Sequence, residues 1–172
     1  MTEAATTGED EYSGLFGAFR YSFRATDSNV FRLYVLVSFV LGFILGLTFV
    51  LALIFWFVET LGHSALDTTS NAFLGVVAMF VLGPLFAPVL FVARRHRRGE
   101  ATVSTYDTLL ALGGFLFVVS LYAGLIITVP PEYQTANAGV IGEFLYSLPQ
   151  LFGLVPPLAA ALVIFAIHRF AR

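Results

Sequence analysis

The sequence contains no cysteine and no lysine, and charged residues of both signs are scarce. Without cysteine the chain forms no disulfide, carries no thiol nucleophile and offers no thiolate ligand to a metal. All nine basic residues are therefore arginine. Charged residues make up 12% of the chain, against about 25% in an average soluble domain. So little charge does not suit a protein whose whole surface faces water.

Apolar residues are abundant instead. They make up 58% of the sequence, and the mean hydropathy is +0.87. A soluble domain of about 150 residues leaves roughly 30% of its surface exposed, so it cannot hide such an apolar surplus in one core. The composition predicts a single domain that has lipid as its main solvent.

Four apolar stretches are long enough to cross a bilayer, which takes about 20 residues in a helix. They cover residues 33–58, 72–93, 109–129 and 148–167. The first is too long, and starts too far into the chain, for the apolar region of a cleaved signal peptide. We therefore expect an all-α, polytopic membrane protein with a four-transmembrane-helix bundle over residues 27–172.

The arginines predict the orientation of these spans. They precede span one, follow span two and follow span four, at Arg20, Arg24, Arg32, Arg94, Arg95, Arg97, Arg98, Arg169 and Arg172. The loops 59–71 and 130–147 contain none. Because cytoplasmic flanks are enriched in basic residues, both termini are expected in the cytoplasm of a multi-pass protein of the cell (plasma) membrane.

Local signals mark helix ends and an additional segment before the spans. Asp27 or Ser28 can cap the start of span one, and Pro130-Pro131 should end span three. Residues 1–10 are acidic and are expected to be disordered. Residues 11–26 place aromatic side chains at helical spacing beside arginines. This pattern predicts an amphipathic interfacial helix, which lies on the membrane surface or packs under the bundle.

Small residues recur at four-residue spacing in span one, at Ser38, Gly42 and Gly46. Such a ladder lets two helix backbones approach closely. It predicts a helix-packing face, either for a neighbouring span of the same chain or for a homodimer.

Proline interrupts spans two and four, at Gly83-Pro84, Pro88 and Pro156-Pro157. Each proline removes a backbone donor and frees the carbonyl four residues earlier. We expect helix kinks at these positions, which either shape packing or line a path through the membrane. No ionisable residue lies at mid-depth, which disfavours a carrier coupled to protons or sodium.

Catalytic and metal-binding patterns are missing. The predicted topology places His63 on the opposite side of the membrane from His96 and His168, so the three histidines cannot share one site. No catalytic or phosphate-binding motif is present. The sequence predicts no catalytic residue, no cofactor and no metal, and therefore no enzyme.

The densest charge is the cluster Arg94, Arg95, Arg97 and Arg98 around His96. It is expected to anchor the topology or to bind anionic lipid headgroups. Nucleic acid is not an expected partner, because the run is short and no folded reading domain accompanies it.

The arginine-only composition, the acidic tail and the segment 19–27 (FRYSFRATD) leading into 31–34 (FRLY) resemble those of small, uncharacterised four-span membrane proteins of halophilic archaea. The resemblance carries no motif of known mechanism and implies no functional residues. The most economical expectation is a non-enzymatic structural or accessory subunit that acts through helix packing, in a homo-oligomer or a larger membrane complex. The alternative is a small oligomeric channel or transporter that uses spans two and four.

Overall fold

The computed structural model describes residues 14–60, 65–99, 104–135 and 138–171, and these residues form helices without any strand. The elements are α1 (Gly14–Ala25), α2 (Asn29–Thr60), α3 (Ala65–Arg97), α4 (Ser104–Ile127), the 3-10 helix η1 (Pro131–Tyr133), α5 (Gly139–Tyr146), the 3-10 helix η2 (Gln150–Leu154) and α6 (Val155–Phe170). The expected all-α bundle is confirmed. The acidic tail 1–10 and His63 lie outside the described residues.

Four helical segments have the length and apolar character of membrane spans: Asn29–Phe55, Val77–Arg97, Ser104–Ile127 and Gln150–Phe170. Their number agrees with the prediction, but their ends do not. The second span continues through the arginines to Arg97, because a helix can extend beyond the hydrocarbon into the headgroup region. Apolar content marks the hydrocarbon crossing, whereas backbone hydrogen bonding sets the helix ends.

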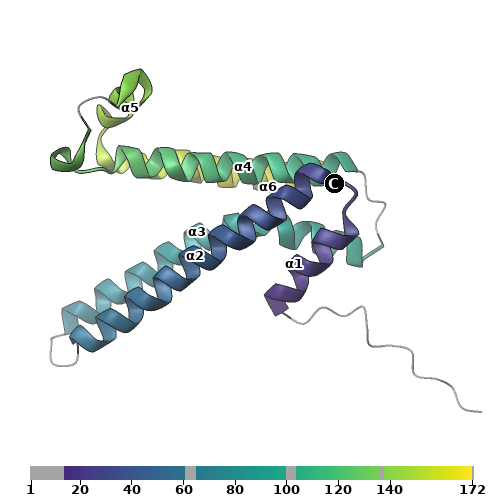
Figure 1. Ribbon diagram of the computed structural model, residues 1–172, viewed down its shortest axis with the longest axis horizontal. Coiled ribbons are helices and arrows are strands. Elements are labelled where there is room, and N and C mark those ends of the chain that lie inside the picture. Colours follow the sequence, from purple (N-terminus) through teal and green to yellow (C-terminus); the bar gives the residue numbers. More distant parts are fainter. Residues whose placement is uncertain (1–13, 61–64, 100–103, 136–137, 172) are drawn as a thin grey trace, which may run out of the picture.

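The spans form two hairpins, α2–α3 and α4–α6, that meet at one end and diverge toward the other (Figure 1). The start of α2, the end of α3, the start of α4 and the end of α6 all lie at the shared end. We call it the arginine-rich end, because its described residues include Arg20, Arg24, Arg32, Arg94, Arg95, Arg97, Arg98 and Arg169.

The core sits near the arginine-rich end, where the two hairpins touch. Tyr34 of α2 is fully buried there, and its hydroxyl donates a 2.6 Å hydrogen bond to the carbonyl of Leu85 in α3. Its ring lies where a Cβ on Gly114 of α4 would be, and it meets Phe115 edge-on at 5.3 Å between centroids. One tyrosine therefore joins three spans, and glycine provides the space for its ring.

The α4–α6 hairpin is closely packed at the opposite end as well. A Cβ on Gly124 would overlap the carbonyl of Gly153, and a Cβ on Gly153 would come 2.8 Å from the carbonyl of Gly124. Only glycine lets the two backbones approach so closely. This contact fixes where the connection between α4 and α6 leaves the bundle.

Helix α1 confirms a helix within the predicted segment 11–26, and one of its faces packs on the bundle. Ala18, Phe19 and Ser22 are buried. Phe19 meets Phe39 and Phe86 edge-on, at centroid distances of 5.6 Å and 5.3 Å. The helix thus lies against α2 and α3, with its arginines exposed.

Candidate functional site

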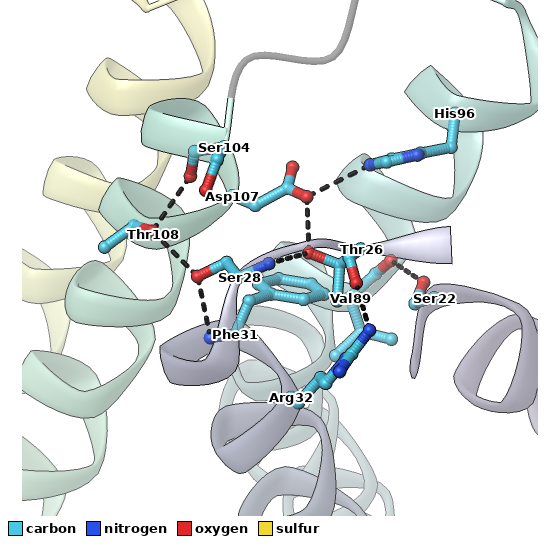
Figure 2. Close-up of polar contacts among 10 residues, drawn as sticks. All are labelled: Ser22, Thr26, Ser28, Phe31, Arg32, Val89, His96, Ser104, Asp107 and Thr108. Carbon is cyan, nitrogen blue, oxygen red and sulfur yellow. Dashed lines mark hydrogen bonds and ion pairs between the residues drawn. The ribbon is translucent and has the colours of Figure 1, made fainter. Parts of the chain in front are cut away.

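The richest group of polar side chains surrounds Asp107, in the first turn of α4 at the arginine-rich end (Figure 2). Asp107 is 2% exposed. Its Oδ2 accepts a 2.6 Å hydrogen bond from the Thr26 hydroxyl and lies 3.0 Å from Nε2 of His96. Its Oδ1 is buried and has no hydrogen-bond partner among the described residues. Burial of a carboxylate is costly unless it is paired, so Thr26 and His96 stabilise Asp107 in place.

The linker between α1 and α2 supplies this network and connects it to α4. The Thr26 hydroxyl accepts the Ser28 amide at 3.2 Å, and the Thr26 carbonyl accepts a 2.9 Å hydrogen bond from Arg32. The Ser28 hydroxyl lies 2.7 Å from that of Thr108 and accepts the Phe31 amide at 3.3 Å. Of the two expected caps of α2, Asp27 and Ser28, the Phe31 bond identifies Ser28. Figure 2 shows the linker running between the ends of α3 and α4.

A second group next to Asp107 joins α3, α4 and α6 through rings. Tyr106 and His168 share a 2.6 Å hydrogen bond between the hydroxyl and Nδ1. His168 stacks on Phe91 with ring centroids 3.9 Å apart. The Arg95 guanidinium lies 4.2 Å from the centroid of the Tyr106 ring, within the range of a cation–π interaction. Consecutive residues of α4, Tyr106 and Asp107, thus reach the two histidines of this end.

The geometry suits a connection between helices better than a reaction. Thr26 and His96 both approach the same oxygen of Asp107, so Asp107 does not orient His96 to take the Thr26 proton, as a nucleophilic triad requires. Among the described residues, no three His, Asp or Glu side chains gather where they could hold a metal ion. The cluster therefore links the α1–α2 linker to α3 and α4, while the neighbouring rings link α3 and α4 to α6.

The predicted small-residue ladder divides into two parts. A Cβ on Gly42 would overlap the Phe86 ring of α3, so this glycine already serves packing within the chain. Ser38 is buried, and its hydroxyl donates a hydrogen bond to the carbonyl of Val35 in the same helix. Gly46, one turn further along α2, has no described atom within 4 Å of where its Cβ would be, apart from its chain neighbours and the nearby backbone of α2 itself.

The prolines of span two lie inside a continuous helix. Both Pro84 and Pro88 are within α3. Hydroxyls from other helices reach carbonyls of the same segment: Tyr34 donates to Leu85, and Ser22 donates to Val89 at 3.0 Å. Gly83 is exposed and has open space beside it. The carbonyls of Leu85 and Val89, each one residue after a proline, are thus used for packing between helices.

The prolines of span four correct the expectation of a mid-helix kink. Pro156 and Pro157 occupy the first turn of α6, which begins at Val155. The backbone N–H groups of a helix's first turn have no acceptor within the helix, so proline, which lacks an N–H, fits there without breaking the helix. The carbonyl of Phe152, expected to be free, accepts the amide of Val155 at the end of η2. The apolar run continues through this point, so hydropathy alone places these prolines near the middle of a span although a helix begins there.

Most of the arginine cluster faces outward. Arg94, Arg97 and Arg98 are exposed, whereas Arg95 is partly buried over Tyr106. Sequence reasoning did not predict the site around Asp107, Tyr106 and His168. One signal was available: Asp107 is the only acidic residue in the apolar helix α4.

The four apolar helices and the two hairpins that they form define a multi-pass integral membrane protein. A family model matches residues 1–172, and the chain belongs to the family described as "Domain of unknown function (DUF8056)". No curated protein and no solved structure matches the chain.

Proposed function

We propose that this protein is a non-enzymatic structural or accessory subunit that binds another membrane protein through α2. The observation that carries the proposal is the contrast between the two parts of that helix. Phe31, Tyr34, Val35, Ser38 and Gly42 are buried near the arginine-rich end. No side chain of residues 43–55 is buried. Almost half of the span Asn29–Phe55 therefore has no side chain that the chain itself buries.

Exposure alone does not indicate a partner, because lipid covers apolar side chains in a bilayer. Gly46 supplies the additional argument. Glycine inside a helix costs about 1 kcal/mol relative to alanine unless close packing makes use of it. At Gly42 the Phe86 ring makes use of it, but at Gly46 none of the described residues does. The open position supports a contact with a helix from another polypeptide.

The polar cluster supports a packing role rather than a chemical one. Its contacts run between helices, from the α1–α2 linker to α4, from α3 to α4 and from α4 to α6. They hold the two hairpins together at one end. A rigid joint at that end would present the remainder of α2 at a fixed angle to a partner.

The alternative, a small oligomeric channel or transporter that uses spans two and four, has less support. The prolines of span four begin α6, and carbonyls near Pro88 in α3 accept hydroxyls of Tyr34 and Ser22. Tyr34 and Ser22 therefore cover a buried part of α3 that a water-lined path along this helix would need to leave open.

The proposal places the arginine-rich end on the cytoplasmic side of the cell membrane. Basic residues are retained on the cytoplasmic side during insertion. The exposed Arg94, Arg97 and Arg98 would lie among headgroups, where anionic lipids attract them. A reporter fused within residues 61–64 should then be external, and a cytoplasmic signal there would contradict the orientation.

The test is recovery of the full chain from its native membrane in mild detergent, comparing Gly46→Ile with Gly46→Ala. Isoleucine fills the open position, whereas alanine keeps it small. We expect the unaltered chain and Gly46→Ala to recover one membrane protein in a constant ratio, and Gly46→Ile to lose it. Two differently tagged copies show whether that protein is a second copy. Recovery of the chain alone, or an unchanged ratio with Gly46→Ile, contradicts the proposal.

A further inference from the structure

Helix α5 exposes an apolar surface that no other described part of the chain covers. Val140, Ile141 and Phe144 are 86%, 77% and 63% exposed. No residue of α5 is buried. In Figure 1, α5 stands to one side of the α4–α6 hairpin, next to the end that is opposite the arginine-rich end.

The connections of α5 keep it at the membrane surface. It lies in the segment that leaves α4 after Ile127 and returns at Gln150. The contact between Gly124 and Gly153 brings the two ends of this segment to the same depth. Eight helical residues are about 12 Å long, and the interfacial region on each side of the hydrocarbon is about 5–8 Å thick. A helix of this size, attached on both sides, lies within or next to that region.

The distribution of side chains on α5 is two-sided. At about 100° per residue, Val140, Ile141 and Phe144 fall in one sector of the helix. Glu143, the only charged residue of α5, is exposed at the margin of this sector, about 60° from Val140 and about 160° from Ile141. A short helix with an apolar face and a polar face suits the plane of the interface, where each face meets its preferred surroundings. Tyr133, 75% exposed and close in sequence, is a residue type enriched at this depth.

We propose that α5 is an interfacial helix whose occupant is the lipid of the leaflet opposite the arginine-rich end. Val140, Ile141 and Phe144 insert at the boundary between headgroups and acyl chains, and Glu143 faces water. Lipid is the occupant that the attachment of α5 favours, because α4 and α6 hold the helix at the depth where acyl chains begin. The molecule would then have one amphipathic helix at each end, α1 and α5. This inference does not depend on the proposed subunit role.

The experiment uses the full chain, whose lack of cysteine allows single labels at chosen positions. Ile141→Cys carries an environment-sensitive fluorophore on the apolar face, and Glu143→Cys carries the same fluorophore on the polar face. Leu116→Cys, on the exposed side of α4, serves as a reference within the bilayer. The proteins are reconstituted in phosphatidylcholine vesicles that contain nitroxide lipids, and iodide is added as the aqueous quencher.

We expect the label at position 141 to emit at shorter wavelength and to be quenched several-fold more by shallow nitroxide lipids than the label at 143. Iodide should show the reverse order. The label at 116 should respond more to deep nitroxides than to shallow ones. Phe144→Cys is the second apolar-face variant and should behave like Ile141→Cys.

Two results would overturn the proposal. Equal iodide quenching at 141 and 143 would mean that the apolar face lies in water. A short-wavelength emission at 141 that responds to neither quencher would mean that protein, a second copy or another subunit, covers α5.

Discussion

The two ends of the α2–α3 hairpin differ in how deeply the rest of the chain buries the side chains of α2. At the arginine-rich end, Phe31 and Tyr34 are buried, and a hydrogen-bonded network around Asp107 reaches α3 and α4. Toward the opposite end, residues 43–55 contain no buried side chain. Polar contacts between helices stabilise the fold where several helices converge, because each buried polar group then has a hydrogen-bond partner. The comparison teaches that contacts within the chain join the helices at one end of this bundle, whereas the side chains of α2 toward the other end face its surroundings.

The largest expected effect is at the centre of the joint. Asp107→Ala leaves the Thr26 hydroxyl and His96 buried without their acceptor. Removal of one member of a buried polar pair costs about 3 kcal/mol. We expect a loss of this size in the free energy of unfolding, measured by denaturant titration in detergent.

The matched control removes the same charge from an exposed neighbour of the network. Asp27 is exposed, and Asp27→Ala should change the free energy of unfolding by less than about 0.5 kcal/mol. Equal losses for the two variants would mean that net charge, not the network around Asp107, stabilises this end.

A second contrast compares two glycines of the spans. Gly124→Ala pushes a methyl group into the backbone of Gly153, which cannot rotate away, so we expect a loss of about 1–3 kcal/mol. Gly46→Ala adds the same methyl group in open space and should be neutral or stabilising by up to about 1 kcal/mol. Thermal unfolding of the two variants in one detergent gives the comparison, and similar losses would contradict the assigned packing.

A smaller effect is expected from the hydroxyl of Tyr34. Tyr34→Phe keeps the ring beside Gly114 but leaves the Leu85 carbonyl without that donor, a loss of about 1 kcal/mol. Tyr122 is 67% exposed, so Tyr122→Phe should leave the unfolding midpoint unchanged. A midpoint for Tyr34→Phe equal to that of the unaltered chain would mean that the bond adds nothing to stability.

The sequence predicted the features of this fold that depend on local composition. Four spans follow from four apolar runs, and the capping side chains Asp27 and Ser28 before span one narrowed its cap to two residues, of which the structure uses Ser28. Span four shows the limit of such reasoning. Its apolar run continues through Pro156, and hydropathy cannot distinguish the first turn of a helix from its middle.

The site around Asp107 depends on contacts between distant segments, which explains why it was not predicted. Thr26 and Asp107 are separated by 81 positions in the chain. His96 lies within an arginine cluster for which the sequence predicts a topological role, and that role requires no partner for the histidine. Gly42 and Gly46 are identical in the sequence pattern, and only the position of Phe86 distinguishes them. Composition sets which residues enter the membrane, whereas their pairing depends on helix crossing.

The central claim is that the hairpins are joined at the arginine-rich end and diverge at the other, and distances between paired spin labels test it most directly. Cysteines at Leu33 and Leu109 report on the joined end, and cysteines at Ile54 and Leu125 report on the divergent end; all four positions are exposed. The account predicts a short, narrow distance distribution for the first pair and a clearly longer one for the second. Equal distances, or a shorter distance for the second pair, would contradict it.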